Sequence, residues 1–253
     1  MIRRNDAGRE RSVVMAERLK YNRILLKISG EALGGASGRG LDFEVIDRVC
    51  GAVARCAKEG VQIGIVVGGG NFWRGLKDGR QMKERTRADQ MGMLATAMNC
   101  LALEDILKQK DVDVRVMTAV AMAPVAEPYD SARAVRHMEK GRVVILGCGT
   151  GNPYFSTDTA ATLRGAEIGA DVVMMAKNID GVYSADPRTD PSAVKYDEIT
   201  YDDILSKHLK VIDSTAASLA LDNRLPLLMF ALKDPENILR AVHGEKIGTL
   251  VKV

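Results

Sequence analysis

Three glycine-rich segments each follow an apolar, strand-like run, and each is suited to cradling a phosphate group. They are Ser29-Gly30, Gly68-Gly69-Gly70 and Gly147–Gly151. Backbone N–H groups exposed at such turns, with a helix N-terminus behind them, form binding sites for anions. A single glycine turn is more often just a tight turn, but three of them in one chain favour phosphate binding. The sequence therefore predicts a phosphate-handling site.

Charged side chains beside these segments could support phosphoryl transfer, which needs positive charge on the migrating group and little covalent chemistry. Lys27 leaves a buried strand just before the first turn. Arg74 follows the triple glycine and could hold an acceptor phosphate. Asp158 is expected to cap a helix after the third segment while facing the ligand. Each of the three residues could instead have a purely structural role. Lys27 would then be an ordinary lysine at the end of a strand, Arg74 a loop charge and Asp158 a helix cap.

The turn-rich segment 180–187 could bind a nucleotide. The Tyr183 ring could flank a flat base and Asp186 could hold a ribose or a metal, although alone the segment would be a surface turn. Two common nucleotide motifs are missing, since there is no G-x-x-x-x-G-K-[ST] and 147–152 lacks the last glycine of G-x-G-x-x-G. The pattern thus argues against a P-loop kinase and a dinucleotide-binding Rossmann domain.

The elements that must position these residues alternate between strands and helices. Runs rich in Val, Ile and Leu predict strands over 23–29, 61–67, 114–120, 142–147, 171–176, 225–232 and 248–253. Apolar spacing predicts helices over 42–58, 89–110, 131–140, 158–168, 213–222 and 235–243. The apolar side expected for 89–110 consists of Met91, Leu94, Met98, Leu101 and Leu107. The fold class is α/β, a mainly parallel twisted sheet with helices on both faces.

The domain organisation follows from the same pattern. Residues 1–22 are expected to be a mobile tail, and 23–253 a single domain with no linker inside it. We expect this domain to divide near residue 170 into two unequal lobes. In parallel sheets ligands bind outside the carboxyl ends of the strands, where the glycine segments fall.

Composition narrows the class of protein further. A net charge of +3 and 4% aromatic residues give no basis for nucleic-acid binding. The four cysteines show no C-x-x-C spacing and the three histidines lie far apart, so no protein-bound metal site is expected. No stretch reaches the roughly 18–20 apolar residues of a membrane span, and the first 22 residues lack the core of a signal peptide. We expect a cytoplasmic protein with free thiols and no membrane association.

Over about residues 21–253 the sequence resembles the bacterial UMP kinases, a branch of the amino acid kinase family. The motifs that carry the resemblance are Leu25-Leu26-Lys27-Ile28-Ser29-Gly30-Glu31-Ala32, Val67-Gly68-Gly69-Gly70-Asn71, Asp89-Gln90-Met91-Gly92-Met93-Leu94-Ala95-Thr96, Gly149–Asp158, Asp180-Gly181-Val182-Tyr183 with Asp186-Pro187, and Gly244–Thr249. The triple glycine and Asp180–Tyr183 are shared widely in the family. The segments Asp89–Leu94 and Thr150–Asp158 are typical of the UMP kinase branch.

The resemblance implies the amino acid kinase three-layer sandwich and Mg²⁺-dependent transfer of the ATP γ-phosphate to UMP, in pyrimidine nucleotide biosynthesis. UMP would occupy the lobe of about 23–170 and ATP that of about 171–253. The implied catalytic residues are Lys27, Asp158 and Arg74. Those implied for ATP are Lys27, Ile28, Ser29, Gly30, Gly70, Arg74, Lys177, Asn178, Tyr183 and Asp186. Those implied for UMP are Gly69, Asp89 (on the ribose hydroxyls), Thr150, Gly151, Asn152, Pro153, Tyr154, Phe155, Ser156 and Thr157.

The resemblance also implies an allosteric homohexamer that UTP inhibits and that GTP activates in some relatives. Two departures leave alternatives open. Met175 stands where many relatives carry a second lysine, so Lys177 either takes that role or contacts adenine through its backbone. Glu104 stands where an arginine is expected for the GTP response, although Arg115 and Arg142 are present.

Two other functions remain as alternatives. One is a kinase of the same fold that phosphorylates a small carboxylate or carbamate, with selectivity in the 150–157 loop. The other is a nucleotide sensor or storage protein that binds without turnover. The presence of both Lys27 and Asp158 favours an enzyme, and the 150–157 loop matches the nucleotide branch.

Overall fold

The structure is a computed structural model that describes residues 19–74, 78–79, 82–209 and 211–253. Of the tail expected over 1–22, residues 1–18 lie outside this described part. Residues 19–22 lead into the first strand, and the Lys20 amide donates a hydrogen bond to the Val242 carbonyl, 3.0 Å away.

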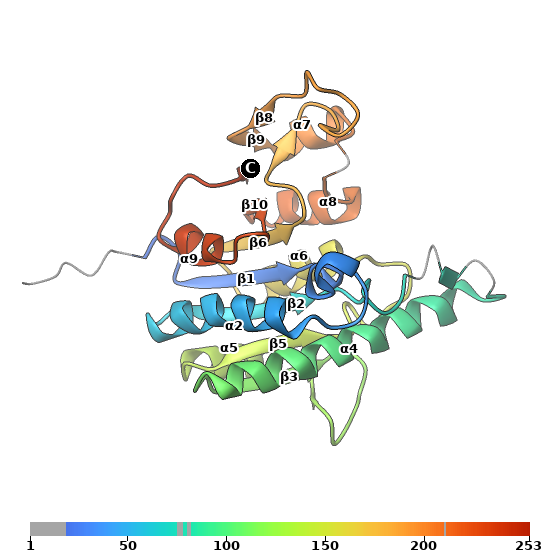
Figure 1. The fold of residues 1–253 in the computed structure, drawn as a ribbon, viewed down its shortest axis with the longest axis vertical. Helices are drawn as coiled ribbons and strands as arrows, with labels where there is room; N and C mark the ends of the chain where they lie inside the picture. The colour runs from blue at the N-terminus through green and yellow to red at the C-terminus, as the bar shows by residue number, and fades with distance from the viewer. Residues whose placement is uncertain (1–18, 75–77, 80–81, 210) are drawn as a thin grey trace, which may run out of the picture.

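A nine-stranded sheet forms the centre of the described chain, in the order β4-β3-β5-β2-β1-β6-β10-β11-β9. Strand β1 (Arg23–Ile28) lies between β2 (Gln62–Val67) and β6 (Val172–Lys177), as Figure 1 shows. The other strands of this sheet are β3 (Val114–Thr118), β4 (Glu127–Pro128), β5 (Val143–Gly147), β9 (Glu198–Thr200), β10 (Leu227–Ala231) and β11 (Thr249–Lys252). Strand β11 runs antiparallel to β10, whereas the other pairings described in this sheet are parallel. The mainly parallel sheet is thereby confirmed.

The predicted helices are present within a few residues of their expected bounds. They are α2 (Phe43–Lys58), α4 (Arg85–Gln109), α5 (Ser131–Glu139), α6 (Thr157–Glu167), α8 (Ser214–Asp222) and α9 (Glu236–Val242). Asp42 caps α2, since its carboxylate accepts hydrogen bonds from the amides of Glu44 and Val45. Several short elements were not predicted: the edge strands β4 and β9, the helices α1 (Gly30–Leu33), η1 (Gly35–Ser37) and α7 (Tyr201–Ser206), and the two-stranded ribbon of β7 (Val182–Tyr183) and β8 (Lys195–Tyr196). They span too few residues to produce a periodic pattern.

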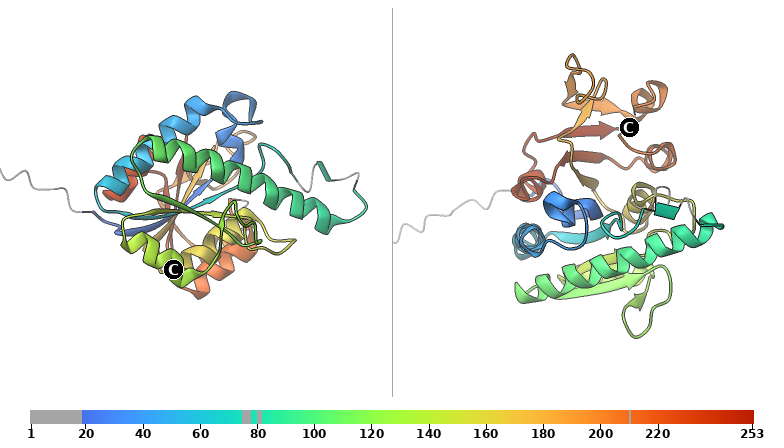
Figure 2. Two further views of the ribbon diagram at one scale, coloured as in Figure 1. Left: turned by 90° about the horizontal axis from the view of Figure 1, so that it is seen from below. Right: turned by 45° about the vertical axis from the view of Figure 1, so that its right-hand side comes forward.

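Helices cover both faces of the sheet, so that three layers enclose two hydrophobic cores (Figure 2). Alternate residues of β1 enter different cores, because successive side chains of a strand point to opposite faces. Ile24 and Leu26 pack in the core beneath α2, α4 and α9. Leu25 packs in the core beneath α5, α6 and α8.

Helix α4 differs from the prediction. Four of the large residues expected to be buried form an exposed line, here called the α4 stripe: Met91, Leu94, Met98 and Leu101, with 40%, 50%, 51% and 39% exposure. Leu107 alone of the expected set is buried, and small or polar side chains such as Ala95, Thr96 and Asn99 face the sheet instead. Small residues let this part of α4 approach the sheet closely, and the four residues of the α4 stripe point away from it. No helix in the described ranges is long and apolar enough to span a membrane.

Candidate active site

The glycine segments and charged residues meet at one edge of the sheet. Strands β1, β2, β5 and β6 are parallel, so their carboxyl ends lie together. Lys27 and Lys177 lie at the ends of β1 and β6, which are neighbours. The triple glycine follows β2 and the Gly147–Gly151 segment follows β5. The topology therefore gathers positive charge and exposed backbone at the place where the sequence predicted a phosphate site.

Two lysines share one carboxylate at this edge. Lys27 Nζ lies 3.0 Å from Asp158 Oδ1, and Lys177 Nζ lies 2.8 Å from Asp158 Oδ2. The three side chains are only 10–18% exposed. Met175, which stands where many relatives carry a second lysine, pairs with Lys27 in the sheet but is fully buried. The ammonium group of Lys177, two residues later, is the one that shares Asp158 with Lys27. The cluster carries a net charge of +1 in a partly dehydrated setting, which suits stabilisation of a transferring phosphoryl group.

Burial and charge act in opposite directions on this cluster. Burial alone would raise the pKa of Asp158, but the charges of Lys27 and Lys177 outweigh it and hold that pKa below its usual value. Burial also lowers the pKa of Lys177, and the nearby Asp158 charge opposes this effect only in part. The carboxylate is thus ionised at neutral pH.

The expectation that Asp158 caps helix α6 was wrong. Ser156 is the cap, because its hydroxyl accepts a hydrogen bond from the Thr159 amide at 3.0 Å. Asp158 lies within the first turn, where its side chain is free to reach both lysines. Asp213, the cap of α8, accepts hydrogen bonds from the hydroxyls of Ser156 and Thr159 and so joins the two helix starts.

Close backbone packing leaves no room for a side chain at two of the glycines. A Cβ atom on Gly69 would lie 2.7 Å from the Gly92 carbonyl oxygen of α4, and one on Gly30 would lie 2.4 Å from that of Gly68. The first two glycine turns therefore touch each other and helix α4. Asn71 and Asn99, both buried, exchange two hydrogen bonds, and Asn99 also donates to the Gly68 carbonyl. No role for this amide pair was predicted from the sequence, because Asn99 lies mid-helix with no motif around it.

A cavity of about 750 Å³ opens beside the lysine cluster. Its lining unites six of the residues expected to bind ATP: Lys27, Ser29, Lys177, Asn178, Tyr183 and Asp186. Ile28, Gly30, Gly70 and Arg74 are not part of this lining, and the Ile28 side chain lies in the core. The lining also includes His208, Leu209 and Val211, which were not predicted from the sequence because they follow α7 outside any regular element or motif.

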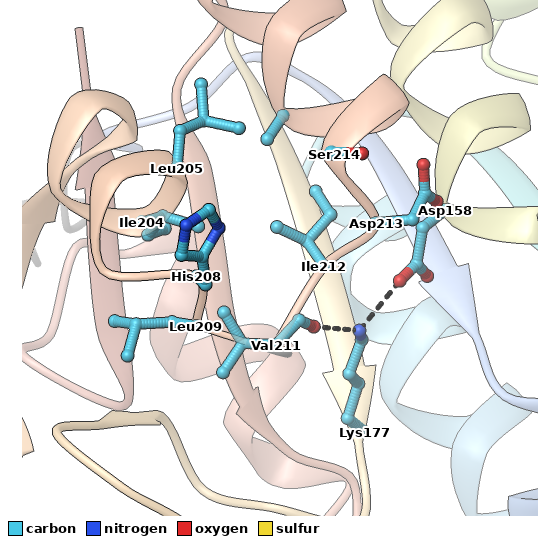
Figure 3. Close-up of a pocket in the computed structure, with 11 residues that line it drawn as sticks. Asp158, Lys177, Ile204, Leu205, His208, Leu209, Val211, Ile212, Asp213 and Ser214 are labelled. Atoms are coloured by element: carbon cyan, nitrogen blue, oxygen red, sulfur yellow. Dashed lines mark hydrogen bonds and ion pairs between the residues drawn. The ribbon is translucent and has the colours of Figure 1, made fainter.

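A second cavity of about 520 Å³ adjoins the first and shares Lys177, His208, Leu209 and Val211 with it. Figure 3 shows Lys177 between Asp158 and the Val211 carbonyl, both of which it contacts, with His208 across the cavity. Most of the other side chains that line this cavity are apolar, including Ile204, Leu205 and Ile212. A cavity with apolar walls and one lysine suits the flat ring of a ligand.

The loop at the cavity mouth holds Tyr183 and Asp186 by local bonds. The Tyr183 hydroxyl donates to Asp180 at 2.8 Å, which fixes the ring at the rim. The Arg188 side chain and amide donate to Asp186 and lower the pKa of this carboxyl to about 2. Asp186 is therefore fully ionised near neutral pH.

Asp89 contacts the loop with which it was expected to bind UMP. Asp89 Oδ2 accepts a hydrogen bond from the Tyr154 amide at 2.9 Å, although 65 positions separate the two residues. Arg85 donates to the same carboxylate at 2.9 Å, and its guanidinium lies 5.5 Å from the centre of the Tyr154 ring. Tyr154 and Phe155 are 68% and 53% exposed, so their rings are accessible to a ligand.

Arg74 bridges the first two glycine turns. Its guanidinium lies 2.9 Å from Glu31, which follows Gly30, and its Nε donates to the Gly70 carbonyl at 3.3 Å. The side chain is 40% exposed, which leaves donors available for an incoming anion. In the described ranges no group of three or more His, Cys, Asp or Glu side chains is arranged to hold a metal ion.

A parallel sheet whose carboxyl edge joins two lysines, glycine turns and a nucleotide-sized cavity defines a phosphotransferase of the α/β class. A model of the amino acid kinase family matches residues 22–233, and the chain belongs to that family.

Solved structures of UMP kinases are similar to this chain. The enzyme from Bacillus anthracis is 35% identical with a TM-score of 0.88, and the match covers 92% of this chain and 96% of that one. The enzyme from Ureaplasma parvum is 36% identical with a TM-score of 0.86, over 92% and 99% of the two chains. A uridylate kinase from Archaeoglobus fulgidus is 32% identical with a TM-score of 0.71, over 90% and 99%.

Proposed function

We propose that this protein phosphorylates UMP to UDP with ATP, as a step of pyrimidine nucleotide biosynthesis. The likeness to UMP kinases over almost the whole chain supports this function. The observation that best supports it is the contact of Lys27 and Lys177 with Asp158. Asp158 directly follows the 150–157 loop, here called the acceptor loop, and both lysines line the cavity of about 750 Å³.

The reaction follows from these positions. A UMP phosphate oxygen forms a bond to the γ-phosphorus of ATP, while the bond from that phosphorus to the β,γ-bridging oxygen breaks and ADP departs. Lys27 and Lys177 neutralise the charge that spreads over the migrating group, and Asp158 keeps both ammonium groups in place. Arg74 holds the acceptor phosphate. Mg²⁺ enters with ATP as part of the substrate.

The substrates divide between two lobes of the one sheet. ATP binds in the cavity at the ends of β1 and β6, and UMP binds between the triple glycine, Asp89 and the 150–157 loop. Lys177 takes the role of the second lysine, because its ammonium group touches Asp158. The Asp89 carboxylate and the Tyr154 ring would recognise the ribose and the base of UMP.

A homohexamer is proposed as the working assembly. The α4 stripe repeats at spacings of three and four residues, the pattern by which one helix packs against another. A row of large apolar side chains this exposed is typical of a protein interface. A second copy of the chain is the occupant proposed for it.

Two nucleotide effectors are proposed with this assembly. UTP would inhibit by placing its uridine in the UMP site, since it shares the base and ribose of UMP. GTP is proposed as an activator at Arg115 and Arg142, which both contact Asp113 on the surface. Glu104, in the place of an expected arginine, pairs with Lys108 and offers an anion no positive charge.

A cytoplasmic location is proposed with this function. All four cysteines lie in the described part of the chain as buried free thiols, a state that suits a reducing compartment.

Release of ADP from Mg·ATP by the purified protein tests the function. UMP, CMP, dUMP, carbamate and acetylglutamate are compared as acceptors, and we expect strong turnover with UMP. Preference for carbamate or acetylglutamate would identify a different kinase of the same family. Tight binding of ATP or UTP without turnover of any acceptor would identify a nucleotide sensor.

A further inference from the structure

One buried charge beside the acceptor loop has no part in the reaction as described. Arg164 lies on α6, and its side chain is only 6% exposed. A guanidinium group that leaves water needs partners to replace its hydration, since an unpaired buried charge is strongly destabilising. The partners of Arg164 therefore indicate what its charge stabilises.

Three groups surround this guanidinium. Arg164 Nη1 donates to Glu167 Oε2 at 2.7 Å, and the Tyr129 hydroxyl donates to the same oxygen at 2.6 Å. The guanidinium lies 3.9 Å from the centre of the Tyr129 ring, so ring and carboxylate together fix its orientation. Arg164 Nη2 is thereby directed to the Gly149 carbonyl oxygen, 3.0 Å away.

The Gly149 carbonyl belongs to a sharply turned segment at the entrance of the acceptor loop. Cys148 and Gly149 have φ angles of +63° and +57°, a left-handed conformation that is unfavourable for Cys148. Thr96 Oγ1 accepts a hydrogen bond from the Cys148 amide at 2.7 Å. The segment is thus held by α4 on one side and by Arg164 of α6 on the other, immediately before Thr150.

We propose that Arg164 is a positioning residue for the acceptor: it fixes the Gly149 carbonyl and thereby the shape of the 150–157 loop that receives UMP. This inference rests on the proposed function. Loss of the bond leaves a carbonyl oxygen without its donor and allows the strained turn to relax. The effect falls on the acceptor and not on ATP, because the residues that line the ATP cavity do not include the partners of Arg164.

Arg164→Lys tests the proposal, since lysine keeps the charge but cannot stack on the ring while bonding to both Glu167 and Gly149. We expect the KM for UMP to rise about tenfold, the effect of one lost charge-assisted hydrogen bond. The KM for ATP and kcat should stay within about twofold of wild type. Titration of UMP without ATP should show the same tenfold rise in Kd.

Arg23→Lys is the matched control. Arg23 also donates to a backbone carbonyl, that of Ile168 at the C-terminal end of α6, at 2.9 Å. Its side chain donates to Ile168 and Gln62, which lie outside the 150–157 loop. Both variants should lower Tm, and only Arg164→Lys should weaken UMP binding. If Arg164→Lys does not fold, Tyr129→Phe removes the hydroxyl donor to Glu167 but keeps the stacked ring. A rise of about twofold in the same KM is then expected.

Equal losses of Tm with unchanged UMP binding in both variants would overturn the proposal and leave Arg164 a purely structural residue. A wild-type protein that binds UMP but does not phosphorylate it would contradict the proposed reaction alone, and the Kd comparison would still decide the role of Arg164. A wild-type protein that does not bind UMP at all would overturn both.

Discussion

Lys177 Nζ lies 2.8 Å from Asp158 Oδ2, and this contact identifies the second positive charge of the site. The two residues come from the end of β6 and the first turn of α6, and Asp158 contacts Lys27 of β1 with its other oxygen. The carboxylate thus aligns two ammonium groups from neighbouring strands. Catalysis should depend on all three groups.

Removing either lysine should lower turnover strongly. Lys27→Ala and Lys177→Ala each remove positive charge that is positioned before the transition state forms, so kcat should fall on the order of 10²-fold or more. Steady-state assays with saturating UMP and Mg·ATP measure this effect. Near-normal kcat for Lys27→Ala would exclude it from phosphoryl transfer, and the same result for Lys177→Ala would return that residue to a role in nucleotide binding alone.

Asp158→Asn should destabilise the fold as well as lower kcat. The variant leaves two neighbouring ammonium groups without their counter-charge, and breaking a buried ion pair costs about 3–5 kcal/mol. The pKa of Asp158 is lower in the folded protein than in the unfolded chain. Its carboxylate therefore stabilises the fold fully at pH values above the usual pKa of an aspartate, about 4. The difference in unfolding free energy from wild type should shrink as pH falls further. Urea unfolding at several pH values tests this, and a difference independent of pH would contradict it.

The pH profile of kcat should reflect Lys177. Burial lowers its pKa below the 10.5 of a free lysine, so rising pH removes the charge and turnover falls on the alkaline side. Lys177→Arg keeps its charge at high pH, because a guanidinium does not lose its proton in this range. The alkaline decline should therefore move upward in this variant. An identical decline in both proteins would assign it to another group.

Asp89 should govern recognition of the UMP ribose. Asp89→Asn is expected to raise the KM for UMP with little change in kcat and to reduce the preference for UMP over dUMP. Arg85→Ala tests the same carboxylate from the other side, because it removes the guanidinium that forms an ion pair with Asp89. Competition between Arg85 and ribose predicts a lower KM for UMP in Arg85→Ala. A fall in kcat for Asp89→Asn at constant KM would contradict the ribose role.

The α4 stripe should control assembly. Met98→Glu places a charge in the middle of the stripe, where burial against a second copy would make it costly, so the proposed hexamer should dissociate. Mass measurement by light scattering reads the result directly. Gln109→Glu adds the same charge near the end of this helix outside the stripe and should leave the mass unchanged. A monomeric wild-type protein would contradict the proposed assembly.

The sequence alone determined the parallel sheet, the main helices and the three glycine segments. Strands buried on both faces show as continuous apolar runs, and the parallel order of β1, β2 and β5 brings their following turns to one edge. Lys27, Asp158 and Asp89 could be singled out because each lies beside such a run or within a recognisable motif. That local information needs no knowledge of distant contacts.

The tertiary structure decided which residues meet. The spacing of large residues in α4 is the same whether that face is buried or exposed, and only packing against the sheet showed that Ala95 and Asn99 face inward while Met98 faces out. The contacts of Lys177 with Asp158 and of Arg164 with Gly149 join different elements of the fold. Sequence periodicity reports the faces of single elements, whereas these contacts depend on how several elements pack together. For that reason the lysine pair and the support of the acceptor loop became visible only in the folded chain.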